Sequence, residues 1–303
     1  MLQTETLSRC PICAGASLHR MLTAPDHESH TGDYGIDECA DCNAAFTNPR
    51  PLESELPKLY EQRSTADFPR MDSTAQRLRD YAIDRYLNGQ LGDSPTSAAT
   101  DFRALDFGCG DGALARGLVR IGRARGCAIE VTAVDFHDVA PPALANIGTT
   151  VNYRSNDEWR ANPSRYNAIF LRHVLEHHPQ PLHLLGELAA TLRPGGRLFI
   201  EVPNRRSVWA RVFGPAYFGY YLPRHLLHFD ALSLRDVIER AGMACASLGL
   251  AHTPLIGRSL GYLSGRDIGN TGPLGLASYP LQIAVDAIAG SSSTLRAVAI
   301  AHG

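Results

Sequence analysis

The stretch from Ala104 to Gly112, ALDFGCGDG, constrains the fold of this chain more than any other. A short apolar run leads to Asp106, glycines follow at positions 108, 110 and 112, and the next residues have a helix-forming pattern. Glycine lets the backbone turn sharply and approach a ligand closely, and a helix N-terminus offers free N–H groups. The stretch therefore predicts a strand, a tight loop and a helix that together bind a nucleoside-bearing cofactor.

Two cofactor types are compatible with this loop. Gly108 and Gly110 begin a match to the dinucleotide pattern G-x-G-x-x-G/A, and Asp135 follows at the end of the next apolar run. The carboxylates of Asp106 and Asp111 argue against NAD, because they suit a cationic, amine-bearing ligand better than a diphosphate. S-adenosylmethionine carries an ammonium and a sulfonium group, so we predict S-adenosylmethionine as the cofactor.

From Phe102 onward the sequence alternates between expected strands and helices. This alternation predicts an α/β fold with a mostly parallel sheet of seven strands and helices on both faces. The expected strands are Arg103–Phe107, Ile129–Asp135, Thr149–Tyr153, Ala168–Leu171, Arg197–Val202, Ala244–Leu250 and Thr294–Ala301. The expected helices are Gly112–Arg123, Pro142–Asn146, Pro181–Leu192, Ser233–Arg240 and Leu281–Ala289, with helical patterning also around Gln76 to Leu87.

Four stretches together resemble a known family. They are LDFGCGDG at 105–112, Val134-Asp135, FLRHVLEH at 170–177, and LRPGGRL at 192–198, a Pro-Gly-Gly turn that leads into an apolar strand. On these residues the chain resembles class I S-adenosylmethionine-dependent methyltransferases over about residues 102–301. The resemblance implies the Rossmann-like sheet of that family and an enzyme that transfers a methyl group.

The resemblance also implies which residues hold the cofactor. Gly108 and Gly110 would pass beside its methionine and ribose portions, Asp106 would lie near its ammonium, and Asp135 would accept hydrogen bonds from both ribose hydroxyls. For Asn156 and Asp157, contact with the adenine amine and a solvated turn are equally compatible with the sequence. The remaining predicted cofactor-binding residues are Cys109, Phe136 and Arg172.

Four early cysteines form the second strong motif. Cys10 and Cys13 make one C-x₂-C pair, and Cys39 and Cys42 make another. This spacing predicts a zinc ribbon, in which each turn supplies two thiolates to a structural Zn²⁺. A redox dithiol is the alternative, but it would not need two copies. Some bacterial small-molecule methyltransferases have a comparable N-terminal module, and the closing phrase FTNPRP at 46–51 is similar to theirs.

Histidines supply the candidate catalytic residues. His173 follows the expected strand Ala168–Leu171 closely, and His225 and His228 lie in an aromatic-rich segment where this superfamily builds its acceptor site. Histidine titrates in the range useful for a general base, so these three are the predicted catalytic residues, and a hydrogen-bonded structural role is the alternative for each. HVLEH at 173–177 also spells the zinc-protease motif H-x-x-E-H. Prolines soon after it argue against the long helix that motif needs.

The chain divides into three expected parts. Residues 1–51 form the zinc-ribbon module, 52–100 a helical segment and linker, and 101–303 the S-adenosylmethionine-binding domain. That domain is expected to contain an aromatic-rich insertion around 205–228 and a Gly-rich flap around 253–278. The linker is expected from Asn88 to Thr100, which is rich in Gly, Ser, Thr, Asp and Pro.

Net charge and hydropathy limit the classes of binding partner that the chain is expected to have. A formal charge of −2 and the acidic residues of the first block argue against nucleic acid, and no apolar run is long enough to span a bilayer. With no basic and apolar leader at the N-terminus, a cytoplasmic location is expected.

The sequence thus predicts a small-molecule methyltransferase, with O-methylation favoured over C-methylation. The alternatives are an enzyme that uses the cofactor without transferring methyl, such as by aminobutyl cyclisation, and an RNA methyltransferase. The sequence does not indicate an oligomeric state.

Overall fold

The computed structural model describes residues 2–60, 73–95, 101–144, 147, 150–270 and 272–301. The chain forms two compact units that alternate along the sequence. Unit 1 comprises residues 1–59, 173–186 and 200–298, and unit 2 comprises 60–172, 187–199 and 299–303. The division expected at residues 51 and 100 stays a prediction. The end of the expected linker, 96–100, lies outside the described residues, as do Asn146 and Thr149.

Seven strands form one sheet, in the order β12-β13-β10-β9-β6-β7-β8. The pairs β6–β7, β6–β9 and β7–β8 are parallel, which confirms the predicted α/β sheet. All seven expected strands are present, and β7 and β13 have the expected bounds. The strands are β6 Phe102–Phe107, β7 Ile129–Asp135, β8 Val151–Ser155, β9 Tyr166–Arg172, β10 Leu192–Pro203, β12 Met243–Ala251 and β13 Thr294–Ala301.

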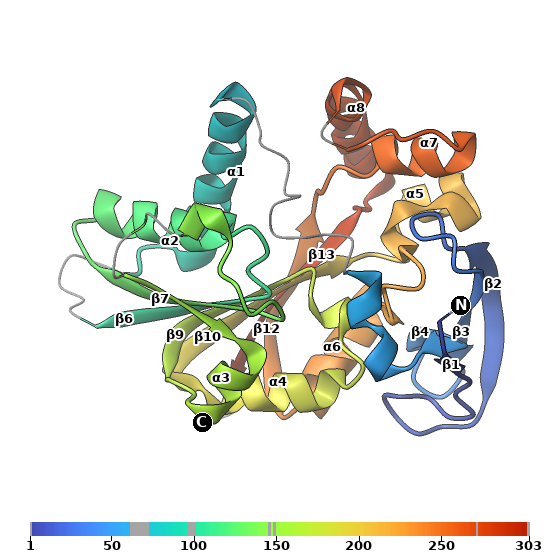
Figure 1. The fold of residues 1–303 in the computed structure, drawn as a ribbon, viewed down its shortest axis with the longest axis horizontal. Helices are drawn as coiled ribbons and strands as arrows, with labels where there is room; N and C mark the ends of the chain where they lie inside the picture. The colour runs from blue at the N-terminus through green and yellow to red at the C-terminus, as the bar shows by residue number, and fades with distance from the viewer. Residues whose placement is uncertain are drawn as a thin grey trace. The chain divides into compact units, whose positions relative to one another are not determined.

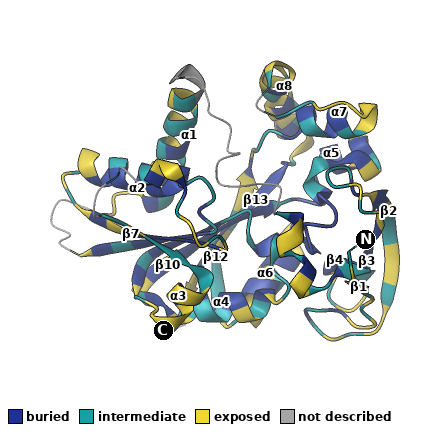
Figure 2. Cartoon of the chain, viewed as in Figure 1, coloured by how far each residue is buried: buried dark blue, intermediate teal, exposed yellow. Residues whose placement is uncertain are grey.

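Unit 2 places helices on both faces of its strands (Figure 1). Helices α1 (Ser73–Leu91) and α2 (Ala113–Ala124) lie together on one face, and α3 (Asn156–Ala161) lies on the other. Helix α2 buries an apolar stripe, and Gly117 on it lets α1 approach, because a Cβ there would lie 2.6 Å from the Ile83 side chain. Figure 2 shows the interior strands as buried. A short 3₁₀ turn, η4, spans Pro142–Leu144.

Unit 1 contains a second, four-stranded sheet in the order β11-β4-β3-β2. Three of its strands come from the N-terminal block: β2 (Leu18–Pro25), β3 (Asp33–Cys39) and β4 (Ala45–Thr47). The fourth, β11 (Leu227–His228), comes from the end of the predicted insertion and pairs antiparallel with β4. The N-terminal block is therefore completed by residues about 180 positions further along the chain. Two short strands at the ends of the N-terminal block, β1 (Thr4–Glu5) and β5 (Arg50–Pro51), form a separate antiparallel pair.

The aromatic residues of the 205–228 segment form a core. Trp209, Phe213, Tyr217 and Tyr220 are buried in one cluster with Ile36 of β3. The Trp209 indole N–H donates to Asp286 Oδ1 at 2.8 Å, which satisfies its polar atom inside that core. These aromatic side chains therefore form part of the core of unit 1.

Further helices follow along the chain. They are α4 Pro181–Ala190, α5 Val208–Phe213, α6 Ala231–Arg240, α7 Ile256–Ser264 and α8 Pro273–Ala289. The 3₁₀ turns are η1 Glu53–Glu55, η2 Pro57–Leu59, η5 Leu175–His177, η6 Gly214–Ala216 and η7 Phe218–Tyr220.

The Gly-rich segment 253–278, expected as a loosely patterned flap, instead contains helix α7 and the start of α8. Its glycines allow close backbone packing. A Cβ on Gly257 would lie 2.7 Å from the Gly269 carbonyl oxygen, and one on Gly275 would lie 2.5 Å from that same oxygen. The missing side chains let these backbone segments pack closely, and the mobility expected of the segment stays a prediction.

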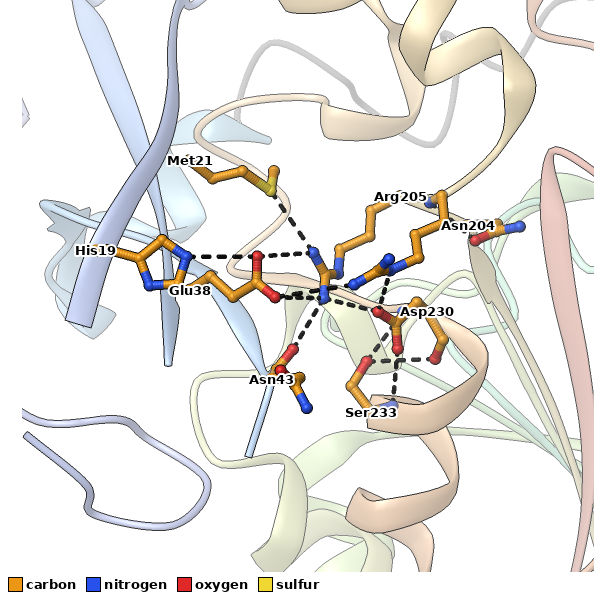
Figure 3. Close-up of polar contacts among 9 residues, drawn as sticks. His19, Met21, Glu38, Asn43, Asn204, Arg205, Asp230 and Ser233 are labelled. Atoms are coloured by element: carbon orange, nitrogen blue, oxygen red, sulfur yellow. Dashed lines mark hydrogen bonds and ion pairs between the residues drawn. The ribbon is translucent and has the colours of Figure 1, made fainter. Parts of the chain in front are cut away.

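A buried arginine joins the N-terminal block to the later part of unit 1 (Figure 3). Arg205, with a side chain 4% exposed, donates to Glu38 Oε1 at 3.2 Å, to the Asn43 carbonyl oxygen at 2.9 Å and to Asp230 Oδ2 at 2.7 Å. Asp230 also caps helix α6 through the Ser233 N–H at 2.9 Å. The guanidinium lies between two carboxylates, which offsets the cost of burying its charge.

In the described residues, no helix is long and apolar enough to cross a membrane.

Candidate active site

The loop after β6 has the backbone shape that its glycines predicted. Gly108, Gly110 and Gly112 have φ angles of 76°, 54° and 73°, in the left-handed region that favours glycine. The Gly108 N–H donates to the Val134 carbonyl oxygen at 2.8 Å, which ties the loop to the end of β7. A Cβ on Gly112 would lie 2.4 Å from the Leu144 side chain. The loop is therefore set both by backbone conformation and by close packing.

Asp135 stands at the carboxyl end of β7 and orders this loop. Its Oδ2 accepts from the Gly110 N–H at 2.8 Å, and its Oδ1 accepts from the Phe136 N–H at 2.9 Å. Burial raises the pKa of this carboxyl, and the two backbone N–H groups partly oppose the rise. Each carboxylate oxygen keeps a further lone pair, so the side chain can still accept from a diol.

Asp106 lies inside unit 2 at the end of β6 and is 4% exposed. Burial raises the pKa of its carboxyl to about 7, although the nearby Arg172 guanidinium and the Ala115 N–H, which donates to Oδ2 at 3.1 Å, act in the opposite direction. Arg172, the last residue of β9, lies over the Tyr86 ring, 4.6 Å from its centroid. A cationic ligand would stabilise the ionised form of Asp106.

Asp111 has a different role from the one its charge suggested. Its carboxylate forms an ion pair with Arg79 of α1, with Arg79 Nη2 3.0 Å from Oδ1. Because Arg79 compensates the charge of Asp111 within unit 2, Asp111 does not support the argument for a cationic ligand. That argument rests on Asp106 and Asp135. The sequence reasoning did not predict Arg79 as this partner.

The other predicted cofactor residues lie around the same strand ends. Cys109 is buried in the loop, and Phe136 is half-exposed, with its ring 5.3 Å from that of Tyr60. Asn156 and the exposed Asp157 begin helix α3, directly after β8. In open α/β sheets, ligands bind at the carboxyl ends of the strands. Their contact with a cofactor stays a prediction.

His173 directly follows β9 and has a left-handed backbone, with φ 54°. Its Nδ1 lies 3.3 Å from Oε1 of Glu176, a carboxylate whose side chain is 1% exposed, and its own side chain is 33% exposed. The His173 Nε2 atom is itself buried and has no hydrogen-bond partner among the described residues, so the exposed part of the side chain is elsewhere on the ring. An imidazole close to a buried carboxylate is an arrangement compatible with a general base. The role of Glu176 was not predicted, although the motif H-x-x-E-H contained it.

His225 lies beside the same carboxylate. Its Nε2 is 3.9 Å from Glu176 Oε1, and its Nδ1 is 2.9 Å from the Gly219 carbonyl oxygen. Burial lowers the pKa of His225 well below its ordinary value, and the neighbouring His177 and His228 lower it further. The Thr47 hydroxyl donates to the His225 carbonyl oxygen at 2.6 Å. The ring is therefore fixed, buried and neutral near pH 7.

His228 lies on β11 within the four-stranded sheet and is 3% exposed. Its Nε2 lies 3.0 Å from the Thr47 hydroxyl oxygen. Burial lowers the pKa of His228 to about 3, and the charge of Arg205 contributes in the same direction. This geometry favours the structural alternative for His228, because an enclosed ring that is neutral throughout the physiological range has poor access to an acceptor.

The four early cysteines converge in unit 1. Their sulfur atoms all lie within 4.8 Å of one another, with Cys10–Cys42 and Cys13–Cys39 at 3.6 Å. The two C-x₂-C turns are alike. Each is followed by a residue with a left-handed backbone, Ala14 at φ 60° and Asn43 at φ 58°. Four convergent thiols from two matching turns fit the donor set of a tetrahedral zinc site.

The comparisons with known proteins identify the family. Residues 69–248 match the family described as "Methyltransferase domain", which is more than half of the chain. The chain belongs to this methyltransferase family. As a member, and with named methyltransferases among its relatives, it is an S-adenosylmethionine-dependent methyltransferase by class.

Two curated relatives of this methyltransferase are described as "Ubiquinone biosynthesis O-methyltransferase". The one from Marinobacter nauticus is 28% identical over 55% of this chain and 73% of its own length. The one from Xanthomonas euvesicatoria is 30% identical over 47% of this chain and 59% of its own length. The solved structure of "the [4+2]-Cyclase SpnF" is similar with a TM-score of 0.50 and 18% identity, covering 84% of this chain and 98% of that one. This last likeness shows the fold.

Proposed function

We propose that this methyltransferase transfers the methyl group of S-adenosylmethionine to an oxygen atom of a small molecule. The observation that carries the proposal is the pair His173–Glu176, in which a partly exposed imidazole lies 3.3 Å from a buried carboxylate. A hydroxyl acceptor must lose its proton as the methyl transfers, and an oriented histidine can take it. The naming of the curated relatives as O-methyltransferases supports oxygen over carbon as the acceptor atom.

In the proposed reaction, the acceptor hydroxyl donates its proton to Nε2 of His173. The acceptor oxygen then attacks the sulfonium methyl in line, the bond from sulfur to methyl breaks, and S-adenosylhomocysteine leaves with the sulfur electron pair. Glu176 would accept from Nδ1–H of His173 as the imidazolium forms and would stabilise its charge. His225 and His228 would position this region. C-methylation follows the same proton balance and stays the second candidate.

Unit 2 would hold the cofactor. Asp106 would pair with its ammonium, Asp135 would accept from its ribose hydroxyls, and the loop Gly108–Gly110 would pass beside it. The remaining proposed contacts are those of Phe136, Asn156, Asp157 and Arg172. In unit 1, Cys10, Cys13, Cys39 and Cys42 would hold a structural Zn²⁺ as four thiolates. A cytoplasmic location, no direct role for nucleic acid, and the domain division stay predictions.

Incubation with methyl-deuterated S-adenosylmethionine and a panel of phenols, catechols and aliphatic alcohols tests this function. The expected product gains a trideuteromethyl group on oxygen, in step with formation of S-adenosylhomocysteine. Label on carbon would replace O-methylation by C-methylation. Formation of methylthioadenosine would indicate aminobutyl chemistry, and label on added RNA would support the nucleic-acid alternative.

A further inference from the structure

A second group of metal-ligating side chains lies in unit 1, separate from the four cysteines. Glu176, His177 and His225 each offer one ligand atom, and these three atoms lie within 4.8 Å of one another. The Glu176 side chain is 1% exposed, and that of His225 is 8% exposed. We propose that Glu176, His177 and His225 bind a divalent transition-metal ion of the zinc class through one carboxylate oxygen and two imidazole nitrogens.

The two histidines are held in the tautomer that metal binding needs. His177 Nδ1 lies 2.9 Å from the Arg224 carbonyl oxygen, and His225 Nδ1 lies 2.9 Å from the Gly219 carbonyl oxygen. A carbonyl oxygen only accepts, so each Nδ1 carries the proton and each Nε2 carries the lone pair. Metal-binding histidines have this same outer contact, in which the second ring nitrogen donates to a backbone carbonyl or carboxylate. The two rings lie with their centroids 4.5 Å apart.

Glu176 is the part of the group that most needs a cation. Neither of its carboxylate oxygens has a hydrogen bond among the described residues. Two ring nitrogens lie near its Oε1, His173 Nδ1 at 3.3 Å and His225 Nε2 at 3.9 Å. A buried carboxylate without hydrogen bonds is costly, and it is normally paired or bound to a metal. Oε1 can accept from His173 Nδ1 while Oε2 binds the metal, because a carboxylate has two oxygens for two partners.

The neighbouring positive charge is compensated elsewhere. The Arg224 guanidinium donates to Ser29 Oγ at 2.6 Å and to the Leu59 carbonyl oxygen at 2.9 Å. Its Nη1 lies 3.7 Å from Asp26 Oδ1, a carboxylate whose side chain is fully buried. Asp26 therefore shares in compensating the charge of Arg224.

The donor set indicates the metal and its coordination. Two imidazoles and one carboxylate suit Zn²⁺, Fe²⁺ or Co²⁺, unlike the four thiolates of the cysteine site. Three protein ligands leave at least one coordination position for water or another oxygen ligand, as in sites where the metal takes part in chemistry. His177 and Glu176 come from the H-x-x-E-H motif at 173–177, but the structure replaces its first histidine by His225 from the 205–228 segment.

Metal counting on the full chain, expressed in zinc-supplemented medium and purified without chelator, tests the site. Wild type should contain about two zinc atoms per chain, one at the cysteines and one here. The X-ray absorption spectrum should then show a mixed first shell, with sulfur at about 2.3 Å and nitrogen or oxygen at about 2.0–2.1 Å. One zinc per chain with an all-sulfur shell would overturn the proposal. A single zinc with only nitrogen and oxygen ligands would support this site and contradict the cysteine site.

Variants assign the second atom. Glu176→Gln keeps the side-chain volume and should reduce zinc by one atom per chain, leaving an all-sulfur shell. His177→Gln should do the same. His178→Gln is the matched control, because His178 is the next residue along and lies outside the group, and it should keep both atoms. Retention of the second zinc in both Glu176→Gln and His177→Gln would overturn the proposal. None of these readouts depends on methyl transfer, so failure of the proposed function would leave the result interpretable.

Discussion

The pKa of Asp106 makes cofactor binding depend on pH. Burial raises the pKa of this carboxyl to about 7, so near neutral pH it is only partly ionised in the folded chain. If the ionised form pairs with the cofactor ammonium, the apparent affinity scales with the ionised fraction, which is roughly one tenth at pH 6 and nine tenths at pH 8. The affinity for S-adenosylhomocysteine should therefore rise about tenfold from pH 6 to pH 8.

Isothermal titration calorimetry in buffers of matched ionic strength measures this change. Asp106→Asn should bind more weakly at pH 8 and lose most of the pH dependence, because its amide cannot ionise. The same substitution should stabilise the free protein at pH 8. The folded-state pKa of Asp106 lies above its unfolded value of 3.8, so its stabilising contribution is lost as the pH rises through about 7. An affinity that is flat from pH 6 to pH 8, or an equal slope in Asp106→Asn, would refute the reasoning.

Four further predictions concern single side chains. Asp135→Ala should weaken S-adenosylhomocysteine binding by about 10- to 100-fold in calorimetry, since a hydrogen bond to a charged group contributes about 1.5–3 kcal/mol; unchanged affinity would exclude a ribose contact. His173→Ala should lower kcat by about 10²–10⁴-fold with cofactor affinity unchanged, and turnover within a few-fold of wild type would place the base elsewhere. Cys39→Ser should lose one zinc atom by elemental analysis and lower the melting temperature; full zinc content would contradict the cysteine site. Arg205→Met should destabilise the fold by about 1–3 kcal/mol in urea, because it removes the guanidinium that bridges the buried Asp230 and the partly buried Glu38 and leaves Arg206 as the arginine paired with Asp230, and a loss below about 0.5 kcal/mol would mean that the Arg205 pairing adds little.

The parallel sheet could be predicted because its signal is local. The strands buried on both faces are short apolar runs, and β7 and β13 were predicted residue by residue. The loop Gly108–Gly112 was predictable for the same reason, because three glycines at alternate positions favour a run of left-handed backbone that other residues adopt only singly. Helix boundaries were less exact. Helix α8 was predicted to begin at Leu281, yet it begins at Pro273 and contains Pro280, a residue that usually ends or kinks a helix.

Contacts between distant segments could not be predicted from spacing. Arg205 pairs with Glu38 from 167 positions away, and the Thr47 hydroxyl reaches the His225 carbonyl across 178 positions. No periodicity or motif encodes such a pair, because it depends on the three-dimensional arrangement of unit 1. The sequence could not distinguish a catalytic histidine from a structural one, because that distinction depends on how far each side chain is buried. His173 is partly exposed and His228 is enclosed, although both follow apolar runs in the sequence.

Native mass spectrometry with competing nucleotides tests the central claim most directly. The purified chain is incubated with equal concentrations of S-adenosylhomocysteine and NAD⁺, and Asp135→Ala is measured alongside as the matched variant. Wild type should retain one S-adenosylhomocysteine per chain and no NAD⁺, and Asp135→Ala should retain much less. Selective retention of NAD⁺, or binding of S-adenosylhomocysteine that neither Asp135→Ala nor Asp106→Asn weakens, would contradict the account.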